Sequence, residues 1–374
     1  MNRFVGLLAL GLALLTGVAD RPSAAAGTGR SQPSGVKLRW QVPAARPDCP
    51  GMIGPVIAGG LVLTQDASGL IARNAATGRL VWRETSVFHD RRAYHIVVSG
   101  RTVVVTSSDS ICQVEGGDAD GLVVAFDLAT GRRRWLRSPS TDAAQVIVTR
   151  GVVVVSGNDY GTEPSVNAYR LADGRNLWSA GTGSDGRYTL WSAIPVGGDV
   201  LVAHYGEPNR VDAVTGQLRG SWPAAWTPLT TYRKWVLIGD SADWSTKAIR
   251  VADRGLAWSM DRVSNRVATD GRRLYLGIGN SLEAYDAASG RPVWAVNLGA
   301  RVGRPIQAGG RVYTPVAGRP IAVRDAVTGV RIPAGIPLPR ISAVAGQRLF
   351  VADRGRLRAY DLDLQLVPLA QAGR

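Results

Sequence analysis

Short runs of apolar residues recur along the chain, and turn sequences separate them. Residues 122–126 and 79–82 illustrate the two kinds of run that flank a turn, and both are typical of β-strands. A further apolar run, such as residues 152–155, precedes each of these pairs. The pattern predicts repeated units of four antiparallel strands, and no segment predicts a helix longer than a turn or two.

The turn sequences share one motif, in which Asp or Asn is followed by Thr or Ser, then Gly and, four residues after the Gly, Trp. Aspartate can accept hydrogen bonds from the backbone two residues further on, and glycine supplies the positive φ that closes such hairpins. The copies recur about every 35 to 53 residues, which is the spacing of propeller blades. They end at Trp82, Trp135, Trp178, Trp222, Trp258, Trp294 and, where the tryptophan is replaced, Pro333.

An eighth unit runs from Ile341 to Asp361 and lacks both the Thr-Gly pair and the tryptophan. The missing strand is found at the other end of the chain, at residues 37–41, which include Trp40. We therefore predict an all-β fold, an eight-bladed β-propeller of four-stranded antiparallel blades, closed by the N-terminal strand completing the last blade. The blades are expected within residues 52–362, before a short C-terminal tail.

The motif Ala-x-Asp-x-x-Thr-Gly-x-x-x-Trp resembles the tryptophan-docking repeat of PQQ-like, quinoprotein-type β-propellers. That family includes PQQ-dependent dehydrogenases and non-enzymatic BamB-like propellers, and the resemblance covers nearly the whole chain. In the family, the tryptophan of one blade packs against the turn of its neighbour. Blades four and seven are expected to be the weakest links, because Trp222 is displaced by two residues and Pro333 replaces tryptophan. The resemblance implies structural docking roles for Trp40, Trp82, Trp135, Trp178, Trp258 and Trp294.

The resemblance to the quinoprotein enzymes does not extend to their cofactor residues. Those enzymes hold PQQ under adjacent cysteines and calcium on a Glu, Asn and Asp set, whereas Cys49 and Cys112 are far apart and no ligand set can be matched. We therefore expect no PQQ, no calcium and no other metal. The histidines lack the spacing of a zinc site. They are His89, His95 and His204.

Two enzyme classes remain as alternatives. One is a PQQ-dependent dehydrogenase, because the fold is shared. The other is a hydrolase or lyase acting on polysaccharide, which needs paired carboxylates. The pairs to test are Asp159 with Glu163 and Asp240 with Asp243.

The N-terminal residues predict export. Arg3 is followed by an apolar run at residues 4–15 and by small residues at 23–26, so residues 1–26 read as a signal peptide and 27–374 as the propeller domain. No later segment is long and apolar enough to span a bilayer. The mature protein is expected to be soluble, extracytoplasmic or secreted, and monomeric.

Export also bears on the cysteines and on the charge. Cys49 and Cys112 are predicted to lie in loops on the same face of neighbouring blades, and an even cysteine count in an exported chain favours a disulfide between them. The net charge is +15, carried mostly by scattered arginines. This distribution reflects either coding bias or attraction to anionic envelope polymers, and it does not indicate a nucleic-acid partner.

Aromatic residues gather in the long connections on one face of the predicted propeller. Aromatic rings beside arginine provide flat apolar contact together with stacking and hydrogen bonds. The leading prediction is thus a non-enzymatic binding or scaffolding propeller for a protein, a peptide or an envelope polymer; the alternative, that these rings are buried in their own blades, stays open. The candidate ligand-binding face comprises Tyr94, Tyr160, Tyr188, Trp191, Trp226, Tyr232, Trp244 and Arg187.

Overall fold

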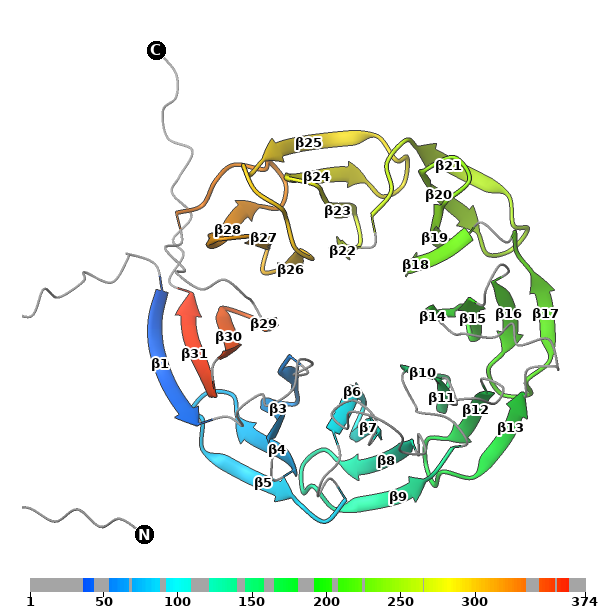
Figure 1. Cartoon of the computed structure of the whole chain (residues 1–374), viewed down its shortest axis with the longest axis vertical. Helices are drawn as coiled ribbons and strands as arrows, with labels where there is room; N and C mark the ends of the chain where they lie inside the picture. The colour runs from blue at the N-terminus through cyan, green and yellow to red at the C-terminus, as the bar shows by residue number, and fades with distance from the viewer. Residues whose placement is uncertain are drawn as a thin grey trace, which may run out of the picture. The chain divides into compact units, whose positions relative to one another are not determined.

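The computed structural model describes thirteen segments, all within one compact unit, Pro33–Arg374. These are residues 36–43, 54–66, 69–87, 92–108, 121–139, 145–157, 165–180, 192–203, 208–223, 226–264, 266–333, 343–353 and 355–362. Their regular elements are β-strands in eight antiparallel sheets arranged as a propeller (Figure 1), which confirms the predicted fold class and blade number.

Each blade is a meander whose first strand lies nearest the centre in Figure 1. Blade one comprises β2 (Val56–Ala58), β3 (Leu61–Asp66), β4 (Gly69–Asn74) and β5 (Leu80–Glu84). Blade two comprises β6 (Arg92–Ser99), β7 (Thr102–Ser108), β8 (Leu122–Asp127) and β9 (Arg133–Arg137). Blade three comprises β10 (Gln145–Thr149), β11 (Val152–Gly157), β12 (Ser165–Arg170) and β13 (Asn176–Ala180). Blade four comprises β14 (Ser192–Val196), β15 (Asp199–Ala203), β16 (Asn209–Asp212) and β17 (Leu218–Ser221).

The remaining blades follow in chain order. Blade five comprises β18 (Trp226–Tyr232), β19 (Trp235–Asp240), β20 (Ser245–Arg250) and β21 (Leu256–Met260). Blade six comprises β22 (Val267–Thr269), β23 (Arg273–Ile278), β24 (Ser281–Asp286) and β25 (Pro292–Asn297). Blade seven comprises β26 (Ile306–Ala308), β27 (Arg311–Val316) and β28 (Arg319–Asp325). Blade eight comprises β29 (Ala343–Ala345), β30 (Arg348–Asp353), β31 (Arg356–Leu362) and, from the other end of the chain, β1 (Val36–Pro43).

The N-terminal strand β1 is the outer strand of blade eight. It pairs antiparallel with β31, from Val36 opposite Leu362 to Pro43 opposite Arg356, with a bulge between Leu38 and Trp40. Arg39 Nε lies 2.6 Å from a carboxylate oxygen of Asp361, which adds an ion pair across the two strands. The innermost strand of this blade, β29, contacts β2 of blade one, so the last blade adjoins the first.

Blade seven departs from the predicted four strands, because its described residues form only three. A single bridge between Arg324 and Arg331 begins a fourth strand, and Pro333 follows two residues later. Pro333 stands where most other blades have tryptophan, and its nitrogen faces away from β28, because the preceding residue, Ile332, donates to Val323 O.

The core lies between neighbouring sheets. In blade two, Val103, Val104 and Val105 are all inaccessible to solvent, which is why the second strand reads as a continuous apolar run. Val104 belongs to the same apolar cluster as Val153 and Val155 of blade three. Packing between the faces of adjacent blades thus stabilises the ring.

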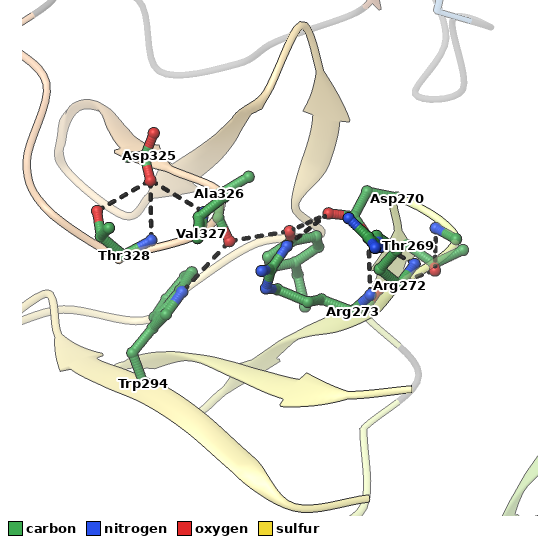
Figure 2. A network of polar contacts seen from close by, with 11 residues as sticks. Thr269, Asp270, Arg272, Arg273, Trp294, Asp325, Ala326, Val327 and Thr328 are labelled. Carbon is green, nitrogen blue, oxygen red and sulfur yellow. Dashed lines mark hydrogen bonds and ion pairs between the residues drawn. The ribbon is translucent and has the colours of Figure 1, made fainter. Parts of the chain in front are cut away.

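The repeated turn is closed by its first side chain. Asp127 Oδ1 accepts hydrogen bonds from the backbone N–H groups of Ala129 and Thr130, both at 3.1 Å, and Gly131 adopts a φ of +68°. Figure 2 shows the same arrangement in blade seven, where Asp325 accepts from Val327 and Thr328. The motif therefore fixes a hairpin that presents a carbonyl and a glycine to the preceding blade.

Tryptophans dock on these hairpins. Trp294 of blade six donates its indole N–H to Ala326 O of blade seven at 3.3 Å (Figure 2). The indole also lies over the turn glycine, since a Cβ added at Gly329 would be 2.7 Å from a ring carbon of Trp294. Five equivalent bonds link other neighbouring blades. Their donors are Trp40, Trp82, Trp135, Trp178 and Trp258, and their acceptors are the carbonyls of Ala75, Leu128, Leu171, Ala213 and Ala287, respectively.

The turn carboxylates predict sensitivity to acid. A hydrogen bond from Arg134 lowers the pKa of Asp127 from 3.8 to about 2. A hydrogen bond from Arg219 likewise lowers the pKa of Asp212. Because these folded-state pKa values lie below the unfolded ones, the stabilisation is complete above pH 3.8 and is lost as the pH falls through about 2.

We expect the melting temperature, followed by near-ultraviolet circular dichroism, to fall across that interval. The double variant Asp127→Asn and Asp212→Asn should be less stable at neutral pH and should show a shallower acid dependence. An unchanged dependence would contradict this assignment.

Candidate functional site

The part of the predicted aromatic face that the structure describes with its side chains lies in blade five. Residues 241–244 form the turn between β19 and β20, on the side of the blade opposite the Asp-x-x-Thr-Gly hairpins. Trp226 begins β18 and Trp244 ends the turn, whereas Tyr94 and Tyr232 are described only by their backbone in β6 and β18. Outside the described residues lie Tyr160, Tyr188, Trp191, Arg187, Cys49, Cys112, Asp159, Glu163, His89 and His204.

Lys247 joins the two carboxylates of this turn. Its Nζ lies 2.6 Å from Asp240 Oδ2 and 2.7 Å from Asp243 Oδ2. The Asp240 side chain is 5% exposed and that of Lys247 18% exposed, whereas that of Asp243 is half exposed. The Lys247 ammonium group therefore links Asp243, in the turn, to Asp240, which is buried on the blade.

These contacts keep all three groups charged. Burial raises the pKa of Asp240, but hydrogen bonds from Lys247, the Ala242 amide and Trp226 outweigh it, so the net pKa is lowered. Hydrogen bonds from Lys247 and Ser245 lower the pKa of Asp243. The same carboxylates raise the pKa of Lys247.

Trp226 supports this turn instead of facing solvent. Its indole Nε1 donates to Asp240 Oδ2 at 2.8 Å, and its ring meets Trp222 edge to face with centroids 5.9 Å apart. Trp226 is half-buried and Trp222 is 2% exposed. The Trp226 ring is thus partly buried in its own blade, which was the alternative to an exposed binding residue.

Trp244 has the opposite environment. Its side chain is 71% exposed, and its backbone has a φ of +56°, a conformation that costs free energy in a residue with a Cβ. The paired charges of Asp240, Asp243 and Lys247 hold the turn that presents this indole. Exposed aromatic rings on a fixed turn are typical of recognition sites.

The sequence analysis did not single out Lys247 or the buried position of Trp222. Lysine is rare in this chain, since only Lys37, Lys234 and Lys247 occur, and that rarity was the available signal. The position of Lys247 between two carboxylates depends on the pairing of β20 with β19, where Lys247 lies opposite Ile238.

The arrangement does not favour acid–base hydrolysis at Asp240 and Asp243. A glycosidase acid needs a raised pKa so that it carries a proton at neutral pH, whereas both of these pKa values are lowered. The described residues also contain no group of three or more His, Cys, Asp or Glu side chains that could hold a metal ion.

Comparison with known protein families identifies the family of this chain. The model of the family described as outer membrane protein assembly factor BamB matches residues 31–135, 116–227 and 243–363. The chain belongs to this family. BamB-family membership agrees with the tryptophan-docking resemblance seen in the repeats, and three consecutive matches account for most of the propeller.

Solved structures share the fold with this BamB-family chain at low sequence identity. BamB from Moraxella catarrhalis aligns with a TM-score of 0.64 at 11% identity, over 87% of this chain and 99% of that one. The computationally designed Ika8 protein aligns with a TM-score of 0.66 at 13% identity, over 87% and 99%. Quinohemoprotein alcohol dehydrogenase from Comamonas testosteroni aligns with a TM-score of 0.64 at 12% identity, over 88% and 77%. The search of curated proteins returned no match.

Proposed function

We propose that this BamB-family chain is an extracytoplasmic, non-enzymatic scaffolding propeller whose partner is a protein. The observation that carries the proposal is the exposed indole of Trp244 on a turn whose charges are already paired. In a chain of this family, such a turn is suited to binding, because it presents an exposed aromatic ring. Its carboxylates are not available as acid catalysts. Among the described residues, none belongs to a helix long and apolar enough to cross a membrane.

Crosslinking from the indole position tests the proposal. A photoreactive amino acid at position 244 of the exported chain should give one discrete protein adduct in cells, identified by mass spectrometry. The control carries the same group at Val327, which is exposed in a hairpin on the opposite face of the propeller. A discrete adduct that forms from position 244 but not from position 327 supports a protein partner on the blade-five face. Equal labelling from both positions, or none, contradicts it.

Removing the charge of Lys247 should disrupt the same turn. In Lys247→Met the apolar stem is kept, but Asp240 and Asp243 lose their shared cation and repel one another. Since Asp240 is nearly buried, we expect a loss of about 2 kcal/mol in unfolding free energy and a weaker adduct at position 244.

Urea unfolding measures this effect, and Lys234→Met is the matched control. Lys234 is exposed and forms no ion pair with a described residue. Equal free energies of unfolding for the two variants would show that Lys247 does not stabilise the turn.

The quinoprotein dehydrogenase alternative rests on likeness of fold alone. The BamB-family chain should therefore not reduce an artificial electron acceptor when PQQ, calcium and an alcohol are supplied. Turnover that depends on added PQQ would overturn the scaffolding proposal.

A further inference from the structure

A basic groove borders the third strand of blade seven. It has a volume of about 690 Å³ and lies between the end of β25 and the strand β28. Apolar contact is available from Leu298 and Ile321, and positive charge from Arg319, Arg324 and Arg331.

No described carboxylate forms an ion pair with the arginines of this groove. Arg319 donates to the Leu298 carbonyl at 2.9 Å, and Arg324 donates to the Gly329 carbonyl at 3.4 Å. Arg324 Nε is buried and has no hydrogen-bond acceptor in the part of the chain that the structure describes. Burial, followed by the charge of Arg331, lowers the pKa of Arg324. An uncompensated cation in partly buried surroundings favours an anionic ligand.

The same groove borders a strand edge. Ile332 donates its backbone N–H to Val323 O at 2.9 Å, after which no described residue continues the ladder along β28. Because backbone groups alternate along a strand, Ile321 directs its N–H and carbonyl to the same side as Val323. The described part of blade seven therefore offers hydrogen-bonding groups beside arginine side chains, which is how an extended peptide is recognised.

The sequence that directly follows Pro333 offers no carboxylate to these arginines. Residues 334–342 contain Arg340 but no acidic residue, and they include Pro337 and Pro339. They would add positive charge beside the arginines, and each proline removes one backbone donor.

We propose that the groove beside β28 binds an acidic, extended segment of a partner protein. The segment pairs with β28 around Ile321, beyond the part of the strand that Val330 and Ile332 already occupy, and its carboxylates pair with Arg319, Arg324 and Arg331. This site lies two blades from Trp244 and is independent of the blade-five proposal.

Binding of a defined peptide to the full chain tests the site. The probe is a fluorescein-labelled peptide of alternating glutamate and valine, as long as β28 at seven residues. We expect saturable binding by fluorescence anisotropy, weakened about tenfold by Arg324→Gln and further by the additional change Arg331→Gln. Arg132→Gln, at an exposed arginine of the blade-two turn, and Trp244→Ala should leave the affinity unchanged.

Hydrogen exchange of the β28 amides separates strand addition from simple charge attraction. The peptide should slow exchange at Ile321 and Val323, and a peptide of alternating lysine and valine should not. Three outcomes would overturn the proposal: protection of these amides in the free protein equal to that of β24, affinity unaffected by the two arginine changes, or arginine-dependent binding to phosphatidylglycerol vesicles without peptide binding.

Discussion

A protein that begins at residue 44 should be less stable than one that begins at residue 27 by roughly 3–6 kcal/mol, because the packing of a whole strand is lost. The shorter protein lacks β1, so β31 loses its outer antiparallel partner and keeps only β30. It also loses the bond from Trp40 Nε1 to Ala75 O, at 3.1 Å, which links blade eight to blade one.

Urea unfolding of the two proteins, produced with the same export signal, measures this difference. A third protein that begins at residue 33 retains β1 and controls for loss of the preceding residues. Coincident unfolding midpoints for starts at 27 and 44 would show that β1 contributes little to the stability of blade eight.

Gly131→Ala should destabilise the propeller by about 3 kcal/mol. Alanine at a φ of +68° is strained, and its Cβ would lie 2.5 Å from Trp82 Cδ2, so the docked indole must move. The displacement also weakens the bond from Trp82 Nε1 to Leu128 O, at 2.9 Å.

Gly100→Ala is the control for this prediction. Gly100 has a φ of +56°, but an added Cβ meets no atom within 4 Å, so only the backbone cost of about 1 kcal/mol applies. The difference between the two variants in urea unfolding isolates the contact with the indole. Equal effects would show that the tryptophan adapts at no cost.

The repeats made the fold predictable because each hairpin is encoded locally. Asp127 and Gly131 close their turn through neighbours in sequence, and the tryptophan four residues later has its acceptor in the next copy of the same turn. Pro333 marked the irregular blade, although the predicted fourth strand is not found in its described residues. Local periodicity thus reports blades well, since each blade forms from consecutive strands.

The candidate site was predictable only in part, because it depends on contacts between side chains. Trp226 and Trp244 both lie near loops in the sequence, yet one bonds to Asp240 and the other is exposed. Nothing in their sequence positions distinguishes them. The signal peptide at residues 1–26 and the bridge between Cys49 and Cys112 lie outside the described residues and stay predictions.

The tryptophan bonds divide the ring into two arcs. Trp40, Trp82, Trp135 and Trp178 join blades eight, one, two, three and four in succession. Trp258 and Trp294 join blades five, six and seven. Between the arcs, Trp222 Nε1 has no acceptor among the described residues and Pro333 has no indole, which leaves two seams without an indole bond. At the seam between blades four and five, Arg210 and Arg254 instead donate to the carbonyls of Val251 and Ser221.

Each proposed binding site includes a blade that borders one of these seams. The Trp244 turn lies in the blade that follows Trp222, and the groove of β28 lies in the blade that ends at Pro333. We expect the two arcs to behave as separate cooperative units in hydrogen exchange. A partner that binds across a seam would stabilise the closed ring.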